Sequence, residues 1–298
     1  MAFEPPQRLV RALGEMPDPA QDADWLGQLP HLAQEALDRR GVAAQRIQAP
    51  GGRSSVVVLV RYPDGTPAAL KLAPPSARPD RELAALAHWG GFGAVRVLDS
   101  RHDDGGLLLE RLQPEVSLRS LPDAKALLEA AGTIRRLWVA PPAGHGFETV
   151  AQRTGRQAEA MAGAPEEAQP LVRDALAARD GLGAAAEEEF LLHGNFRQGK
   201  VLAGDRAPWL TVGPEPLVGE RAYDLARLVR DRLEDQVASS AGAAGARRRV
   251  NKLADSLEVD RDRLRAWTLF RAVESGTRAL RAGRRRDAEL LLEFAGWL

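Results

Sequence analysis

The 298-residue chain contains no cysteine, has no net charge by formal count, and has no apolar run near the length of a membrane span. The absence of cysteine excludes a disulfide framework, zinc–thiolate sites and a thiol nucleophile. The balance of 41 basic and 41 acidic residues argues against broad electrostatic binding of nucleic acid or anionic lipid. The first residues show no basic stretch followed by an apolar one, so no secretory signal is predicted. We therefore expect a cytoplasmic protein that binds neither nucleic acid nor membrane.

The first third of the chain is predicted to form a small sheet with helices. An amphipathic helix is expected over residues 22–40, interrupted early by Pro30. A Gly-rich loop, Gly51–Ser55, precedes a predicted hairpin of strands 56–60 and 67–72. The other expected elements are a short helix over 81–89, ended by Gly90 and Gly91, and strands over 95–98 and 107–110.

From residue 122 onward the pattern favours helices, with short strands near His193 and Trp209. The expected helices cover 123–139, parts of 151–178, 222–233, and 261 to the C-terminus. The Ala-, Gly- and Ser-rich stretch 237–246 is predicted to be a mobile connection or a frayed helix end. We expect an α+β fold of two lobes: residues 1–113 form a sheet lobe with an N-terminal helix, and residues 114–298 form a helical lobe.

Residues 193–214 have the layout of a kinase active site without its reactive groups. Kinase-type phosphoryl transfer uses an Asp that accepts the hydroxyl proton, and an Asn and a second Asp that hold magnesium. The first two are spaced H-x-D-x-x-x-x-N, and the second Asp follows on the next strand. In this chain the three positions are occupied by Asn195, Lys200 and Gly213.

The chain resembles the aminoglycoside phosphotransferase family, and within it the streptomycin 6-phosphotransferase and hydroxyurea phosphotransferase branch. That branch reads approximately HGDLHPGNVL and WLxIDPKPxVGDPAYDLAxLLR, where this chain has HGNFRQGKVL at 193–202 and WLTVGPEPLVGERAYDLARLVR at 209–230. Similar stretches lie at 64–72, 89–95 and 107–112. The resemblance covers nearly the whole chain and implies a two-lobed, protein-kinase-like fold.

The resemblance also implies roles for residues outside the degenerate segment. Lys71 matches the strand lysine that contacts nucleotide phosphates, and Glu82 matches its partner on the helix. Gly51–Ser55 matches the phosphate-facing loop, although it lacks the G-x-G-x-x-G pattern. Glu110 to Leu112 matches the connection between the lobes, where backbone groups face an adenine. Tyr223 and Asp224 match a structural pair of the family, so they belong to the scaffold.

The substituted residues lack the chemistry of the reaction. The Asn195 amide cannot accept a proton, and loss of a positioned base costs about 10²–10⁴ in rate. The Lys200 ammonium has only donors and repels a cation, and Gly213 has no side-chain oxygen. The protein ligands of magnesium are therefore missing, and we do not expect magnesium. Glu215, or Asp205, is the alternative carboxylate that an unorthodox metal site would need.

These residues favour a pseudokinase, a non-catalytic binding or regulatory protein related to these phosphotransferases. Its ligand is a small molecule, a nucleotide such as ATP, or a protein partner. A nucleotide would be held by Lys71, Glu82, Glu110 and Leu112, with Lys200 placing its charge where the metal was. The alternative is an active O-phosphotransferase with an alcohol acceptor and an unorthodox metal site. A third hypothesis is another transfer reaction, such as nucleotidylation.

Overall fold

The computed structural model describes residues 3–15, 19–101, 105–182 and 189–298. The chain groups into two compact units. The N-terminal unit comprises Met1–Val116 with Leu202–Gly213, and the C-terminal unit comprises Ser117–Val201 with Pro214–Leu298. Residues 193–201, which include Asn195 and Lys200, are called the catalytic-type loop below. The segment that follows this loop, 202–213, therefore groups with the N-terminal unit. The sequence-based division at 113/114 remains a prediction about domains.

The N-terminal unit is built on an antiparallel sheet of five strands in the order β1-β2-β3-β5-β4. These are β1 (Ala43–Ile47), β2 (Val56–Arg61), β3 (Pro67–Leu72), β4 (Val97–Arg101) and β5 (Gly106–Glu110). The helices are α1 (Gln7–Gly14), α2 (Pro19–Arg40) and α3 (Pro79–Trp89). A second small sheet, in the order β10-β9-β6, joins β6 (Gln113–Ser117), β9 (Val201–Ala203) and β10 (Leu210–Thr211).

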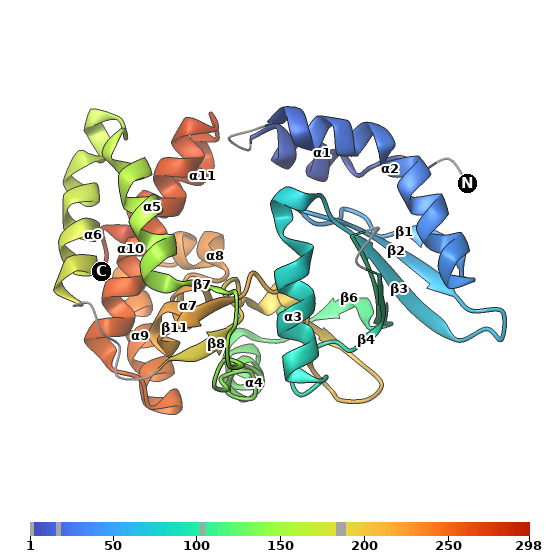
Figure 1. The fold of residues 1–298 in the computed structure, drawn as a ribbon. Coiled ribbons are helices and arrows are strands. Elements are labelled where there is room, and N and C mark those ends of the chain that lie inside the picture. Colours follow the sequence, from blue (N-terminus) through green and yellow to red (C-terminus); the bar gives the residue numbers. More distant parts are fainter. Residues whose placement is uncertain (1–2, 16–18, 102–104, 183–188) are drawn as a thin grey trace. The chain divides into compact units, whose positions relative to one another are not determined.

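Helices α1 and α2 cover one face of the five-stranded sheet (Figure 1). The β-branched run of β2 alternates into this core, where Val56, Val58 and Val60 are fully buried. Helix α2 contributes a buried stripe that includes Leu29 and Ala33. This packing removes apolar surface from water and fixes the register of the hairpin. Its second strand, β3, carries Lys71.

The C-terminal unit is mostly helical, as the sequence predicted. Its helices are α4 (Asp123–Arg135), α5 (Val150–Ala162), α6 (Gln169–Gly181), α7 (Arg221–Val229), α8 (Leu233–Ala238), α9 (Gly242–Leu257), α10 (Arg261–Arg281) and α11 (Arg285–Ala295). Helix α10 packs against α5, α6, α7, α9 and α11 (Figure 1). A small sheet in the order β7-β11-β8 joins β7 (Glu148–Thr149), β8 (Phe190–Leu192) and β11 (Leu217–Gly219).

One local prediction was wrong. Pro30 does not interrupt α2, which runs through it. The cost of a proline inside a helix is offset here because Leu29 and Ala33 on either side of it are buried in the core. Stretch 237–246, predicted to be a mobile connection or a frayed helix end, comprises the end of α8, a connection at 239–241 and the start of α9.

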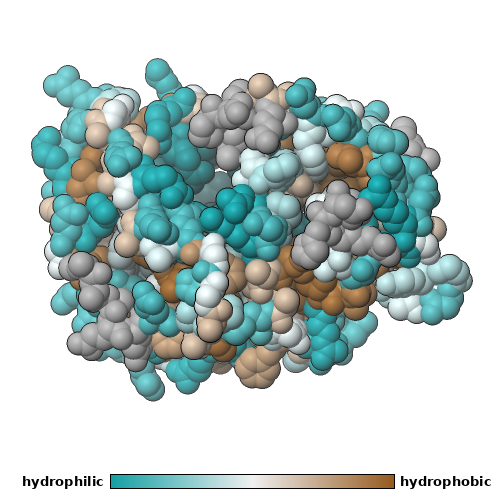
Figure 2. Space-filling view, in the orientation of Figure 1, coloured by the Kyte–Doolittle hydropathy of each residue, from teal (hydrophilic) through white to brown (hydrophobic). Residues whose placement is uncertain are grey.

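No helix in the described part of the chain is both long and apolar enough to cross a membrane. The face drawn in Figure 2 is largely hydrophilic, with hydrophobic residues in small, separate areas. Large exposed hydrophobic side chains among the described residues are few: Val10, Phe92, Leu98, Val116 and Leu128. Single exposed apolar residues of this kind are normal and indicate no function by themselves.

Candidate functional site

The backbone of the catalytic-type loop is held by a buried carboxylate on α7. Asp224 accepts hydrogen bonds from the backbone N–H groups of His193 and Gly194, both at 2.9 Å. Burial raises the pKa of Asp224 to about 6, against the opposing effect of these two donors and of Arg271. From α10, Arg271 donates to the carbonyls of Gly194 and Tyr223, each at 2.8 Å. The loop is therefore fixed from two helices, and Tyr223 and Asp224 belong to its scaffold.

Gly194 allows the loop to approach the residues that follow β10. Its φ is +75°, and a Cβ placed on it would lie 1.9 Å from the carbonyl oxygen of Glu215. The N–H of Glu215 donates to the carbonyl of His193 at 2.9 Å. Any side chain at 194 would collide with this backbone. The contact brings the side chains of Asn195 and Glu215 together.

Both ends of the Asn195 amide are engaged. Its Nδ2 donates to Oε1 of Glu215 at 2.7 Å, and its Oδ1 accepts a longer hydrogen bond of 3.4 Å from Nε of Arg227 on α7. An aspartate in this place would present a carboxylate directly to the carboxylate of Glu215. The amide instead supplies the donor that Glu215 needs. Asn195 is therefore matched to its surroundings as an asparagine.

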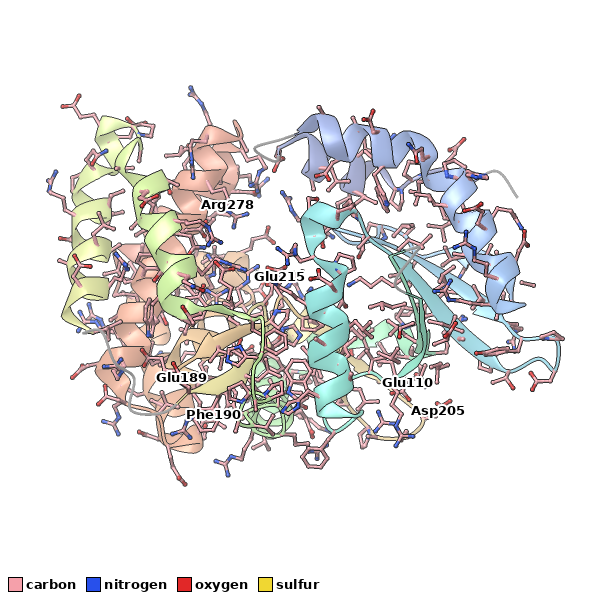
Figure 3. The ribbon with its side chains drawn as sticks, in the orientation of Figure 1. Glu110, Glu189, Phe190, Asp205, Glu215 and Arg278 are labelled. Atoms are coloured by element: carbon pink, nitrogen blue, oxygen red, sulfur yellow. The ribbon has the colours of Figure 1, made fainter. Side chains whose placement is uncertain are left out.

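Glu215 is an exposed residue whose carboxylate lies among cations, and it is labelled in Figure 3. Enclosure by protein atoms acts to raise its pKa, but the charge of Lys200 and the hydrogen bond from Asn195 outweigh this effect. Arg153 and Arg271 act in the same direction, and the pKa of Glu215 is lowered to about 2. At neutral pH this carboxylate is ionised and is a very weak base, because a general base works best with a pKa near the operating pH.

The turn that carries Lys200, a 3₁₀ turn over Gln198–Lys200, is anchored through its first residue. The backbone N–H of Gln198 donates to Asp231, and its side-chain amide donates to Asp123 at 3.2 Å. Arg232 donates to the Gln198 side-chain oxygen at 2.7 Å. Gln198 is fully buried. The position of Lys200 is thus set by a polar network between α4 and the connection from α7 to α8.

Magnesium does not fit the residues at its two expected ligand positions. Magnesium is bound by oxygen atoms. Lys200 offers an ammonium whose charge acts on Glu215, and Gly213 offers no side chain. Gly213 has a φ of +61°, a conformation that Asp tolerates better than most residues. The backbone thus remains compatible with an acidic residue at 213, although none is there. Asp205, the other carboxylate considered, is exposed between β9 and β10 (Figure 3).

In the N-terminal unit, the predicted pair of Lys71 and Glu82 forms. The ammonium of Lys71 on β3 contacts the carboxylate of Glu82 in the first turn of α3. Lys71 is 9 % exposed and Glu82 is 5 % exposed, so the charges are largely shielded from water. The other carboxylate oxygen of Glu82 is buried without a hydrogen-bond partner among the described residues. The ion pair therefore holds the Lys71 side chain in a fixed orientation on one face of the five-stranded sheet.

The stretch after β5 is tied down by Glu110. Its carboxylate accepts from the backbone N–H of Arg96 at 2.8 Å and from Arg206 at 2.6 Å. Leu112 is buried and packs beside Gly204, where an added Cβ would lie 2.9 Å from a Leu112 methyl group. The side chains of Glu110 and Leu112 are therefore structural. The backbone N–H of Glu110 already donates to the carbonyl of Arg96 at 3.0 Å, and the predicted contact with an adenine stays a prediction.

Comparison with known proteins identifies the family of this chain. The family "Aminoglycoside/hydroxyurea antibiotic resistance kinase" matches residues 40–283. The chain belongs to this family. A streptomycin 6-kinase of Streptomyces glaucescens is 35% identical over 273 residues, 89% of this chain and 86% of the relative. A hydroxyurea phosphotransferase of Kitasatospora aureofaciens is 36% identical over 299 residues, 93% of this chain and 83% of the relative.

Among solved structures, the aminoglycoside phosphotransferase APH(4)-Ia is similar with a TM-score of 0.64 at 17% identity, covering 90% of this chain and 97% of that one. This likeness confirms the protein-kinase-like fold: an antiparallel sheet in one unit and helices in the other. A thermostable mutant of the same protein has been solved in a ternary complex with ADP and hygromycin B. That mutant therefore binds a nucleotide and an aminoglycoside.

Sequence reasoning missed Arg227 and Arg271. The first donates to Asn195 and the second to Gly194. Both lie on helices whose pattern was recognised, but an arginine on an amphipathic helix normally indicates a solvated face. Their hydrogen bonds from α7 and α10 show that both residues face the loop. No signal in the sequence marks them.

Proposed function

We propose that this member of the aminoglycoside/hydroxyurea kinase family is a pseudokinase, which binds a small ligand without transferring phosphate. The observation that carries the proposal is the state of Asn195. Its amide makes hydrogen bonds at both ends, to Glu215 and from Arg227, and has no capacity to take up a proton. The loss of both side-chain ligands for magnesium, at 200 and 213, supports the same conclusion. A cytoplasmic location stays a prediction.

The proposal includes nucleotide binding without magnesium. Lys71 is held by Glu82 and would contact phosphate oxygens, as the corresponding strand lysine does in kinases. Lys200 would supply positive charge at the place where relatives of this fold use a metal. The backbone around Glu110 and Leu112 would meet the adenine. ATP is thus the proposed nucleotide and magnesium is not required.

A phosphotransfer assay tests the proposal. Purified protein is incubated with ATP, magnesium and an aminoglycoside or hydroxyurea, and phosphorylated product is measured by mass spectrometry. We expect no more product than with the Asn195→Ala variant. A clear excess of product over that variant contradicts the pseudokinase proposal. A mass increase of the protein itself would instead point to self-modification, such as nucleotidylation.

An active O-phosphotransferase is the second candidate, and the names of the relatives favour it. Streptomycin 6-kinase and hydroxyurea phosphotransferase are both phosphotransferases, and they match this chain over most of its length. The carboxylate of Glu215 beside Asn195 would then orient the acceptor hydroxyl, although its low pKa makes it a weak base. This candidate predicts magnesium-dependent nucleotide hydrolysis that disappears in Lys71→Ala. The pseudokinase proposal predicts none.

A further inference from the structure

Both ends of helix α1 contact the Gly-rich loop, Gly51–Ser55. Before the first turn, the ring of Pro6 packs against Gly51, where an added Cβ would lie 3.0 Å from Cγ of Pro6. After the last turn, Glu15 forms an ion pair with Arg53 of the loop at 2.7 Å. The loop is therefore contacted at two points, from the start and from the end of one short helix.

Helix α1 is itself held in place by the core of the N-terminal unit. It lies with α2 on one face of the five-stranded sheet (Figure 1), and its Leu9 and Leu13 are buried there. The same core contains Val56, the first residue after the Gly-rich loop. Burial of two leucines contributes far more than one partly exposed ion pair. The core thus fixes the helix, and the helix offers the loop two contacts in a fixed place.

Helix α2 anchors a second segment, the connection from β3 to α3. Asp22, in the first turn of α2, accepts a hydrogen bond of 2.6 Å from the hydroxyl of Ser76. Asp22 is fully buried, and its other carboxylate oxygen has no hydrogen-bond partner among the described residues. Since a buried acidic group is costly without partners, this hydrogen bond ties the connection to α2. The connection joins the strand of Lys71 to the helix of Glu82.

These contacts come from a part of the chain that precedes the family match, which begins at residue 40, the last residue of α2. We propose that α1 and α2 hold the Gly-rich loop and the β3–α3 connection in place for the phosphates of a nucleotide, with Glu15 and Asp22 as positioning residues. The inference rests on the proposed nucleotide binding and gives these two helices a part in it. A loop that is ordered before binding loses less conformational freedom when a ligand binds. The helices therefore raise the affinity for a nucleotide and not for a nucleoside without phosphate.

The test compares Glu15→Gln with the matched control Glu35→Gln. Glu35 pairs with Arg39 of its own helix, α2, at 3.3 Å, so the control removes an ion pair that lies within one helix. In Glu15→Gln we expect amide hydrogen exchange over residues 51–55 to be faster by about two- to five-fold, as the loss of one partly exposed ion pair allows.

Nucleotide binding gives the second measurement. ATP and adenosine are titrated separately in EDTA into the full-length variants, after circular dichroism has checked that each is folded. We expect the ATP affinity of Glu15→Gln to fall by about two- to five-fold, with adenosine binding unchanged. Ser76→Ala, which removes the donor to Asp22, should also weaken ATP and not adenosine. The control should bind both as the wild type does.

Equal exchange over residues 51–55 in Glu15→Gln and in the control overturns the inference. An equal loss of affinity for ATP and for adenosine also overturns it, because a general loss of structure would weaken both. The effect of Glu15→Gln should disappear in an Arg53→Gln background, since the two residues act as a pair. An undiminished effect in that background contradicts the inference. Absence of ATP binding by the wild type refutes the proposed nucleotide binding, whereas wild-type binding that Glu15→Gln leaves unchanged refutes only the role of the helices.

Discussion

Restoring the aspartate at 195 alone should harm this protein rather than repair it. In Asn195→Asp, a carboxylate replaces the Nδ2 donor that lies 2.7 Å from Oε1 of Glu215. Two unit charges at that distance repel by about 1.5 kcal/mol even in the limit of bulk water. The lost hydrogen bond adds about 0.5–1.5 kcal/mol. We therefore expect a cost on the order of 2–3 kcal/mol in unfolding free energy at neutral pH and low salt.

A double-mutant cycle isolates the repulsion. Asn195→Asp, Glu215→Gln and the combined variant are unfolded in urea at pH 7, and the free energies are compared with the wild type. We expect Asn195→Asp to cost about 1–2 kcal/mol less in the Glu215→Gln background, a coupling typical of residues in contact. High salt should reduce this coupling because one partner is exposed.

The same reasoning sets the design of a restored kinase site. The triple change Asn195→Asp, Lys200→Asn and Gly213→Asp leaves Glu215 beside the new carboxylate, so it should regain magnesium-dependent nucleotide binding poorly. Adding Glu215→Lys, the residue implied by the family pattern, should improve that binding. Additive effects of substitutions at 195 and 215 would refute the contact on which this argument depends.

Three further predictions concern the scaffold. Gly194→Ala should cost about 2–5 kcal/mol of unfolding free energy, because its φ is positive and an added Cβ would block the backbone contact with Glu215. Gly199→Ala should be nearly neutral, because its Cβ would meet a side chain only at 3.5 Å. Equal effects of the two substitutions in urea unfolding would contradict this geometry. The raised pKa of Asp224 means that the folded state binds its proton more tightly, so its stabilising contribution is present below pH 3.8 and is lost as pH rises to about 6. The unfolding free energy of the wild type, measured relative to Asp224→Asn, should therefore fall as pH rises from 3.8 to about 6. A relative rise across that window would mean that burial does not dominate. Lys71→Met should cost about 3–5 kcal/mol by leaving the Glu82 carboxylate buried and unpaired, and Lys71→Met with Glu82→Leu should recover most of it; a double variant as unstable as the single one would argue against the pair.

Much of the N-terminal unit could be predicted because its signals are local. The β-branched run at 56–60, the turn at Gly65 and the returning strand at 67–72 specify a hairpin with Lys71 on its second strand. The partner of Lys71, Glu82 on the helix that comes next, was implied by the family resemblance and not by the local pattern. Strand β1 was missed because its sequence AAQRI has a single β-branched residue and is mostly exposed. It is a strand only because β2 pairs with it.

The chemistry of the C-terminal unit could be predicted only in part. The replaced residues at 195, 200 and 213 are visible in the sequence, because the surrounding motif fixes their places. The partner of Asn195 is not. Glu215 was weighed as a displaced metal ligand, and the structure instead gives it a hydrogen bond from Asn195. That contact depends on the backbone crossing at Gly194, which joins segments 20 residues apart and leaves no pattern in either.

The central claim is that this family member binds its nucleotide without magnesium and has lost phosphotransfer. The most direct test is a calorimetric titration of ATP into the protein, once with excess magnesium and once with EDTA. The account predicts binding in EDTA with an affinity within a few-fold of that in magnesium, and a loss of binding in Lys71→Ala. Binding that requires magnesium would contradict it and would make the active phosphotransferase the better description.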